Sequence, residues 1–460
     1  MSILIRTIYL LVLLCISVSA LATHNRSGTI RYRHISGYKY EFTVTTCTKS
    51  SSEADRPELE VQWGDGSSDT IPRISIELIP PYDVQINTYV YEHTYTGPAS
   101  YIISVEDPNR NAGVVNISNS VDKVFCIQTE LIISPFIGSP NNSLIIEDCP
   151  CPEFACLNQL YCYNLSAYDP DGDSLSYSLV PCRGEDCLEM SIPAIYRYPD
   201  DIGGGIMTID SITGTLCWDG PQVPGEYNLA IKISEWRNGF YVGAVVQDMQ
   251  LTVQACSNNP PVIQDVPDTC VFAGDSVNIE FIATDPDPGH SVTIYATGAV
   301  FHQSNNPASF DEVTGLNSVS GFFVWEPDCS NASNAPYSII VHAEDNDPGV
   351  QLSDLSTFRI KVNIPPVTNL SVTPTGNSMT LSWDASACVG IVSYNIYRST
   401  DSTNQIDNCC ATGTATMMGY VLVGNSTTNS FIDNGPLIVG NDYCYLITAL
   451  NQAGVESCVS

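Results

Sequence analysis

Residues 163–177 read YNLSAYDPDGDSLSY, in which two alternating apolar and polar stretches flank an acidic turn at residues 169–173. Alternation with a period of two predicts half-buried β-strands, and the Pro and Gly between them predict a tight turn. Residues 281–295, FIATDPDPGHSVTIY, repeat this plan, with Gly289-His290 in place of the last acid. The two segments therefore predict divergent copies of one strand–turn–strand unit.

The rest of the chain shows the same alternation of apolar and polar residues. Residues 40–44 and 101–105 alternate in the same way, and no stretch sustains a helical period. A length of 460 residues suggests roughly three or four domains. We therefore predict an all-β chain, a tandem array of immunoglobulin-like β-sandwich domains.

Extended, Pro-containing joints mark the expected domain boundaries. Two of them lie at residues 257–263 and 362–367, and a less sharp joint lies near residues 136–143. Pro-rich joints favour extended spacers between folded domains. The expected divisions are a signal peptide at 1–22 and β-sandwiches at 23–126, 127–255, 256–364 and 365–460.

The first residues predict export. Arg6 precedes an apolar run at residues 8–18, and the small residues Ala20 and Ala22 follow. This is the order of a signal peptide cleaved before Thr23, and the alternative is an uncleaved anchor. No later apolar run approaches the length of a membrane span. We expect a secreted or cell-surface protein.

The charge balance limits the partners. The chain has 50 acidic and 17 basic residues, a net charge of -33. Without a basic patch it cannot neutralise phosphates, which excludes nucleic acid and anionic lipid as partners. A surface glycan or a protein is the expected ligand.

The segment before residue 106 carries a first resemblance. Its V-Q-W-G-D-G at residues 61–66 is followed by His93-Thr94-Tyr95 and Gly97. This order resembles the polycystic-kidney-disease (PKD) type of immunoglobulin-like domain. Trp63 is then expected to be a core anchor and His93 a core residue, while Asp65 caps a turn for which Gly66 supplies a positive φ.

The later segments carry further resemblances. Both acidic turns, with Trp218 and Trp325 downstream of them, are similar to cadherin-like modules of bacterial surface proteins. The segments LSW at 381–383 and YCYLI at 443–447 resemble fibronectin type III. The serial order resembles exported surface proteins of gliding bacteria, which often end in a sorting domain for type IX secretion. That resemblance implies adhesion or scaffolding.

No catalytic motif stands out. The six histidines form no H-E-x-x-H arrangement, and neither a G-x-S-x-G elbow nor a phosphate loop is present. We therefore name no catalytic residue and expect a non-enzyme. The alternatives are an accessory arm of a secreted hydrolase whose catalytic domain is absent from this chain, or a carbohydrate-binding module.

The first acidic turn is the candidate metal site. Asp169, Asp171 and Asp173 alternate through a turn and direct several hard oxygens at one point, which suits calcium. The alternative is a hairpin turn whose aspartates only solvate its tip. Weaker candidates are Asp285 with Asp287, and the group Glu344, Asp345 and Asp347.

The 18 cysteines predict disulfides in an exported chain. Cys182 and Cys187 are spaced to close a hairpin tip. Cys149 and Cys151, separated by one Pro, are expected to bond separate partners.

Cysteine parity yields further expectations. Cys47 pairs with Cys126, Cys270 pairs with Cys329, and Cys256 belongs to the preceding domain. The last domain then keeps an odd set, Cys388, Cys409, Cys410, Cys444 and Cys458. We therefore expect the chain to continue past Ser460 to a missing partner. The alternative is a free or intermolecular thiol.

Overall fold

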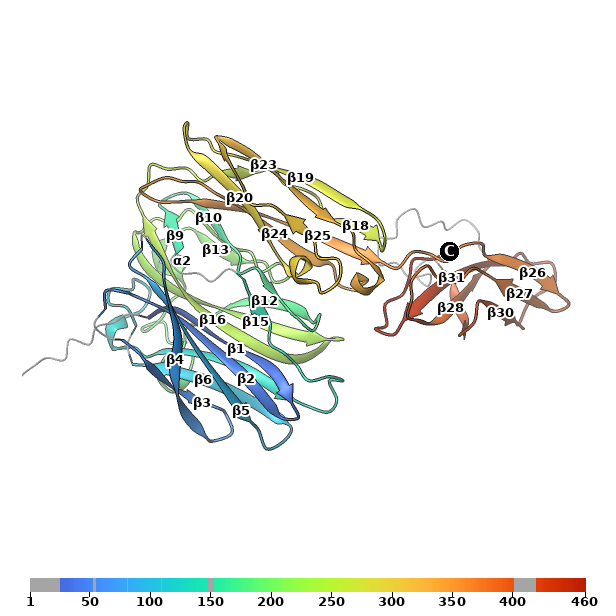
Figure 1. The fold of residues 1–460 in the computed structure, drawn as a ribbon, viewed down its shortest axis with the longest axis horizontal. Helices are drawn as coiled ribbons and strands as arrows, with labels where there is room; N and C mark the ends of the chain where they lie inside the picture. Colours follow the sequence, from blue (N-terminus) through green and yellow to red (C-terminus); the bar gives the residue numbers. More distant parts are fainter. Residues whose placement is uncertain (1–24, 53–54, 81, 109, 148–152, 401–418) are drawn as a thin grey trace, which may run out of the picture. The chain divides into compact units, whose positions relative to one another are not determined.

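The computed structural model describes the chain except for residues 1–24, 53–54, 81, 109, 148–152 and 401–418. The described part is almost wholly β-strand (Figure 1), and its one α-helix, α2 (Pro199–Gly203), has five residues. This confirms the all-β fold class. The chain divides into two compact units, residues 1–257 and 258–460.

The expected signal peptide, residues 1–22, lies outside the described residues. Within the described residues, no helix has the length and apolarity needed to cross a membrane. The elements of the first unit other than α2 are β1 (Asn25–Ser36), β2 (Lys39–Thr48), β3 (Glu58–Gln62), β4 (Ser68–Leu78), β5 (Gln85–Thr94), β6 (Ala99–Asp107), η1 (Ser120–Asp122), β7 (Phe125–Ile133), β8 (Ile145–Ile146), β9 (Glu153–Cys156), β10 (Leu160–Tyr163), β11 (Ala167–Tyr168), β12 (Ser174–Val180), η2 (Glu185–Cys187), β13 (Ile206–Ile209), β14 (Leu216–Asp219), β15 (Gly225–Arg237) and β16 (Phe240–Gln254).

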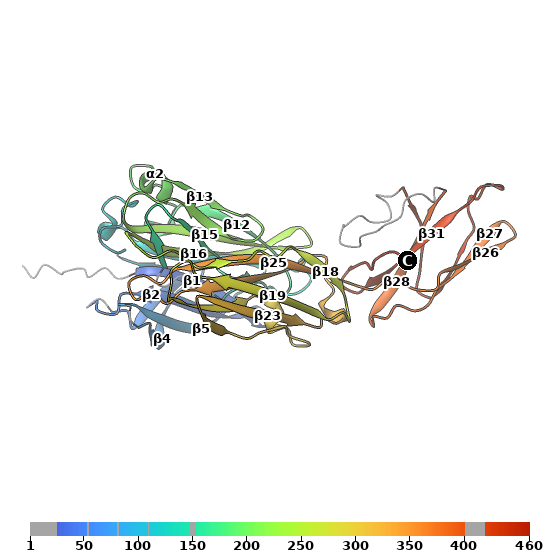
Figure 2. The same cartoon turned by 90° about the horizontal axis from the view of Figure 1, so that it is seen from above.

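The first sandwich is a sheet that returns to its own first strand. Its order is β1-β2-β5-β4-β3-β6-β7-β16, and β16 also pairs with β1 through Gly28 and Asp248. Figure 2 shows β16 beside β1. Successive side chains of a strand point to opposite faces, so alternate residues such as Phe42 and Val44 of β2 enter one buried core.

The W-G-D-G segment lies at this core. Trp63 is fully buried, and the imidazole of His93 stacks on its ring with centroids 4.8 Å apart. The Asp65 carboxylate accepts the backbone N–H of Ser67 at 2.9 Å, and Gly66 has a φ of 89°. The predictions for Trp63, Asp65 and Gly66 are confirmed, whereas His93 is half-buried at the edge of the core, where its Nε2 lies 2.9 Å from Asp65.

Strand β16 belongs to two sandwiches. It pairs with β7 of the first sandwich, with β15 along nearly its whole length, and with β9 in parallel. The boundary expected between residues 126 and 127 falls inside β7, whose Ile127 and Leu131 are part of the first core. The first two sandwiches therefore share a continuous sheet.

The second sandwich packs the sheet β10-β14-β13 against β12, β15 and β16, over a core that contains Trp218. A disulfide between Cys162 and Cys217 joins neighbouring strands β10 and β14. Another disulfide joins Cys156 to Cys256. This bond confirms that Cys256 belongs with the second domain.

Two expected pairings in this unit are wrong. Cys126 bonds Cys187, which excludes both the Cys47–Cys126 and the Cys182–Cys187 pair. The reason is that Cys126, in β7, forms a backbone bridge with Arg183, so the 182–187 loop lies on the first sandwich and does not close its own tip. Cys47 is disulfide-bonded, and Cys182 is a buried free thiol. The expectations for residues 149 and 151 lie outside the described residues.

The second unit holds two further sandwiches. The third packs the sheet β17-β19-β23-β21 against β18-β25-β24-β20-β22, and the fourth packs β26-β27-β30 against β29-β28-β31. Their elements are β17 (Val262–Ile263), β18 (Thr269–Phe272), β19 (Val277–Thr284), β20 (Ser291–Thr297), η3 (Ala299–His302), β21 (Ser309–Phe310), β22 (Val313–Leu316), β23 (Ser318–Trp325), η4 (Cys329–Asn331), β24 (Tyr337–Glu344), β25 (Ser353–Asn363), β26 (Ser371–Thr375), β27 (Ser378–Ser382), β28 (Ile391–Ser399), β29 (Val421–Ser426), β30 (Ser430–Asp433) and β31 (Cys444–Asn451).

Each sandwich of this unit has its own core with a buried tryptophan. Trp325 packs with Phe281 and Phe358 in the third core, and Trp383 packs with Ile447 in the fourth. Separate cores are what tandem β-sandwich domains require, because each must bury its own inward-facing residues.

A disulfide joins Cys329 to Cys388, so the expected Cys270–Cys329 pair is wrong. The bond forms because Cys388 and the η4 turn meet in a small buried cluster with Ile364 and Val455, which spans the boundary expected at 364/365. The free thiols among the described cysteines are Cys182 and Cys444. A free thiol in the second sandwich removes the parity argument, so the cysteine count carries no information on where the chain ends.

Candidate functional site

The first acidic turn (Asp169, Asp171 and Asp173) connects β11 to β12. The buried Oδ1 of Asp169 accepts the backbone N–H groups of Asp171 and Asp173, at 2.8 and 3.1 Å. These bonds fold the turn over its first residue, with Gly172 at a φ of 83°. One carboxylate oxygen from each aspartate lies within 4.8 Å of the others, so the structure brings the three predicted residues together.

The side chain of Arg237 supplies the positive charge at this turn. The guanidinium of Arg237, at the end of β15, donates to Asp173 at 2.7 and 2.8 Å and to Asp171 at 3.0 Å. It also donates to the backbone oxygen of Ser139 and to Asn141, each at 2.8 Å. Arg237 thereby neutralises two of the three predicted ligands and ties them to the 139–141 loop.

A buried acid lies beneath the turn. Glu235 is fully buried and accepts the side-chain amide of Asn141 at 2.8 Å and the backbone N–H of Leu144. The neighbouring Asn142 donates its backbone N–H and its amide to Asp171, both at 2.7 Å. The Asn141-Asn142 pair therefore links Glu235 to the turn.

Burial makes these acids hard to ionise. Burial, with the charge of Glu235, raises the pKa of Asp169 to about 8. Burial, with the charges of Asp173 and Asp171, raises the pKa of Glu235 to about 7. Moreover, Oδ2 of Asp169 is buried without a hydrogen bond. Arg237 alone does not balance the four acids, so Asp169 and Glu235 hold protons near pH 7 and are in part neutral carboxylic acids.

The turn between β19 and β20 repeats this construction. Oδ1 of Asp285 accepts the backbone N–H of Asp287 at 2.7 Å. Asn259 donates its backbone N–H to Asp287 at 2.7 Å and its amide at 3.1 Å. Asn258 donates to the buried Asp345 at 2.6 Å. Asn258, Asn259 and Asp345 thus match Asn141, Asn142 and Glu235.

The charges around this turn differ from those of the first. The second acidic site is defined by Asp285, His290, Asp345 and Asp347. Nδ1 of His290 lies 3.8 Å from Oδ2 of Asp285, and its Nε2 lies 3.7 Å from Oδ2 of Asp347. Asp347 follows Asp345 by two residues, as Arg237 follows Glu235. The position that carries a cation in the first turn therefore carries an acid here.

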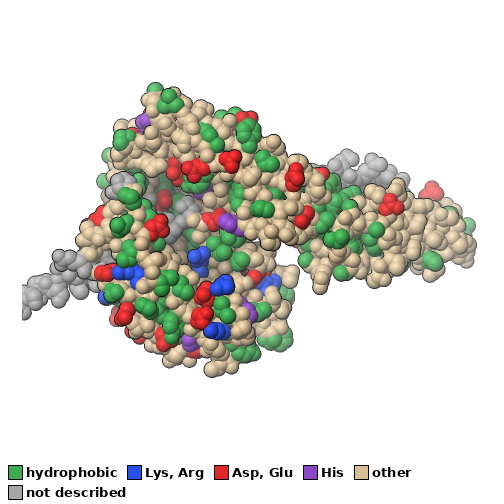
Figure 3. Space-filling model, in the orientation of Figure 1, with side chains coloured by type: hydrophobic (Ala, Val, Ile, Leu, Met, Phe, Trp, Pro, Cys, Tyr) green, Lys and Arg blue, Asp and Glu red, His purple; other side chains and the backbone are tan. Residues whose placement is uncertain are grey.

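Basic residues are scarce throughout the second unit. Its Lys and Arg residues are Arg359, Lys361 and Arg398. Arg359 pairs with Asp268 at 2.6 Å and Arg398 with Asp433 at 2.7 Å. On the face in Figure 3, Lys and Arg side chains gather over the first unit.

The sequence predicted part of this site. Asp285 with Asp287, and the group Glu344, Asp345 and Asp347, were expected as two separate candidates, whereas the structure brings Asp285 and Asp345 together with His290. Asp287 instead accepts hydrogen bonds from Asn259, and Glu344 accepts the hydroxyl of Tyr295 at 2.6 Å. His290 was not predicted as a ligand because the six histidines form no recognised ligand motif in the sequence. The signal that could have found the shared construction is the Asn-Asn dipeptide ahead of each turn, at 141–142 and 258–259.

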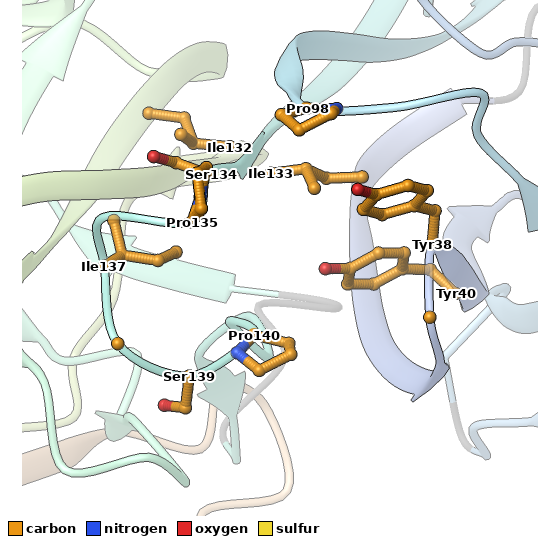
Figure 4. Close-up of a pocket in the computed structure, with 12 residues that line it drawn as sticks. Tyr38, Tyr40, Pro98, Ile132, Ile133, Ser134, Pro135, Ile137, Ser139 and Pro140 are labelled. Atoms are coloured by element: carbon orange, nitrogen blue, oxygen red, sulfur yellow. The ribbon is translucent and has the colours of Figure 1, made fainter.

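A pocket of about 200 Å³ is lined by Ser139, the residue that Arg237 binds (Figure 4). Tyr38 and Tyr40 form one wall, and the end of β7 and the 134–140 loop form the other. Tyr38 is half exposed, whereas Tyr40 is buried. Because Arg237 binds the backbone of Ser139, the acidic turn holds one wall of the pocket in place.

No family model and no curated protein matches the chain. Among solved structures it is similar to Drosophila N-cadherin EC1-4, with 14% identity, 88% of this chain and 91% of that chain covered, and a TM-score of 0.19. The tandem Ig repeats of Dlar match with 16% identity, 48% and 98% coverage and a TM-score of 0.20. Human protocadherin-24 EC1-2 matches with 16% identity, 45% and 93% coverage and a TM-score of 0.16. The fold assignment rests on the sheets and cores described above.

Proposed function

We propose that this chain is an exported, non-catalytic adhesion or scaffold protein, displayed on a cell surface or released from it. The observation that carries the proposal is the disulfide bracing of tandem β-sandwiches, because disulfides persist in oxidising compartments. The disulfides that brace the described sandwiches include Cys126–Cys187, Cys156–Cys256, Cys162–Cys217 and Cys329–Cys388.

The proposed array has the four expected sandwich domains, at residues 23–126, 127–255, 256–364 and 365–460, with the first boundary moved to the end of β7 at Ile133 because β7 is part of the first core. Four separate hydrophobic cores support it. By resemblance the domains are PKD-like, cadherin-like, cadherin-like and fibronectin type III. The same resemblance, to surface proteins of gliding bacteria, extends the proposal to attachment during gliding motility.

Localisation and adhesion test the proposal together. Antibodies against the chain should label intact cells, and beads coated with the purified chain should bind cells or a glycan array. Non-reducing peptide mapping of the native protein should recover these four disulfides among its bonds. A chain found inside the cell with these cysteines reduced would refute export.

A second candidate is the carbohydrate-binding arm of a secreted hydrolase. The pocket that Tyr38 and Tyr40 line on one side favours it, because tyrosine offers a large contact area with one polar tip. Tyr38→Ala should then abolish glycan binding, while an exposed tyrosine-to-alanine change elsewhere should not. Hydrolysis of a polysaccharide or peptide library by the purified chain would overturn the non-catalytic proposal.

Calcium at Asp169, Asp171 and Asp173 stays a prediction. Asp169 offers a buried oxygen without a hydrogen bond, which supports it, whereas a calcium ion there would have to share Asp171 and Asp173 with Arg237. Calorimetric melts of the first unit, in calcium and in chelator, test the prediction. No shift in melting temperature would leave Arg237 as the cation of this turn.

A further inference from the structure

The second acidic site has features that the first lacks. The side chain of Asp285 is fully buried, yet its Oδ2 makes no hydrogen bond. A buried carboxylate oxygen without a donor is costly unless a cation compensates its charge. One carboxylate oxygen of Asp285, one ring nitrogen of His290 and one carboxylate oxygen of Asp345 lie within 4.8 Å of one another. Oδ2 of Asp285 itself lies 3.8 Å from Nδ1 of His290.

The imidazole of His290 is held between two carboxylates. Its Nδ1 faces Asp285 and lacks a hydrogen bond, and its Nε2 faces Asp347. Asp347 is itself fixed, because its Oδ1 accepts the backbone N–H groups of Gly349 and Val350 at 2.8 and 2.9 Å. A histidine that ligates a metal through one ring nitrogen commonly donates its other N–H to a carboxylate.

The donor set selects the kind of cation. Calcium takes oxygen ligands, whereas an imidazole nitrogen with carboxylates suits zinc and similar first-row metals. We propose that Asp285, His290 and Asp345 bind a divalent metal of the zinc class, with Asp347 orienting the imidazole. The inference is independent of the adhesion proposal.

Metal titration of the full-length, disulfide-bonded chain tests the proposal. Zinc chloride should raise the melting temperature of the second unit relative to EDTA, because the metal binds only the folded site. Cobalt should give visible absorption bands typical of nitrogen and oxygen ligation. Calcium at the same concentration should give a much smaller shift.

Variants locate the effect. His290→Gln, a change at a partly exposed side chain, should abolish the zinc shift and the cobalt bands while leaving the melt in EDTA unchanged. Asp347→Asn should weaken zinc binding by roughly 10–100-fold, as for other groups that orient a metal ligand. The matched control is Asp171→Asn in the first turn, which should leave the zinc response intact.

Two outcomes would overturn the proposal. One is the absence of any zinc shift in the wild-type chain, which would make His290 a counter-charge for Asp285 and Asp347. The other is a zinc shift that survives in both His290→Gln and Asp285→Asn, which would place the metal elsewhere.

Discussion

In the second sandwich Arg237 stands two residues after the buried Glu235, and in the third Asp347 stands two residues after the buried Asp345. The surrounding construction is the same in both, because an Asn-Asn pair bonds the buried acid and the D-P-D turn alike. One position therefore decides how the charge of each turn is balanced. In the first turn Arg237 of the chain itself balances the aspartates, whereas the corresponding position of the second turn is the acid Asp347.

The comparison teaches that an acidic turn is not by itself a metal site. The D-P-D-G-D of the first turn has the richer acidic sequence, and it is this turn that an arginine occupies. What identifies a cation site is the balance of buried charge, which depends on residues distant in sequence. Arg237 lies 64 residues from Asp173.

Removing the arginine should have the largest effect. Arg237→Met removes the positive charge that Asp171 and Asp173 share beside the buried Asp169 and Glu235, which should lower the free energy of unfolding of the first unit by about 3 kcal/mol at pH 7. Denaturant unfolding measures it. Calcium should then stabilise the variant more than the wild-type chain, because the turn has lost its own cation.

The matched control is Arg33→Met, which breaks an exposed pair with Glu41 in the same unit. It should cost less than about 1 kcal/mol. Equal losses in the two variants, or equal calcium responses in Arg237→Met and wild type, would show that the first turn does not rely on its arginine.

A rise in pH should lower the stability of the first unit through the acids at the first turn. The pKa values of Asp169 and Glu235 are raised to about 8 and about 7. Their unfolded values are about 4. Between these limits the folded state holds more protons than the unfolded state, so stability falls as pH rises. From pH 5 to 8 the ionisation of Glu235 alone should cost about 2–3 kcal/mol, and the ionisation of Asp169 adds to that loss.

Asp169→Asn tests the origin of this slope, because the amide cannot ionise. In urea unfolding at several pH values, the variant should lose stability less steeply than wild type and be the more stable of the two at pH 8. An unchanged slope would assign the pH dependence to other groups.

The second unit should respond to pH in the opposite direction through its third sandwich. Burial lowers the pKa of His342 to about 4. In the unfolded chain it titrates near 6.5, so the unfolded state binds more protons between these values and stability is lost as pH falls. From pH 7 to 5 the loss should be about 1–2 kcal/mol. His342→Gln should flatten this limb of the profile, and a persistent slope would point to the neighbouring acids.

The smallest expected effects concern the shared construction. Asn142→Ala and Asn259→Ala each remove one amide donor to the D-P-D turn, and each should cost about 1 kcal/mol in its own unit. Urea unfolding of the two variants measures both losses in the free energy of unfolding. Similar losses would support the equivalence of the two turns, whereas a loss in one variant alone would show that they only look alike.

Local patterns in the sequence predicted the local structure well. The alternation around each acidic turn and the W-G-D-G segment predicted strands, a turn and the buried Trp63, because these depend on neighbouring residues. Connectivity could not be predicted in the same way. The Cys126–Cys187 bond depends on how the 182–187 loop packs on β7, which no spacing reveals.

The candidate sites show the same division. The three aspartates of the first turn converge as predicted because they belong to one turn. Glu235 and Arg237 lie on β15, and Asn141 and Asn142 on a separate loop, so only the folded sheet brings them to the turn. His290 is adjacent to its turn, and its role depends on Asp345 and Asp347 from beyond β24.

The Cys329–Cys388 bond has a mechanical consequence. When the chain is stretched from both sides, tension entering through β23 crosses the sulfur bridge to residue 388. Strands β24, β25, β26 and β27, which lie between the bonded cysteines, are left out of the force path. The 59-residue separation corresponds to roughly 200 Å of extended chain. This segment of the chain cannot extend under load unless the Cys329–Cys388 disulfide is reduced.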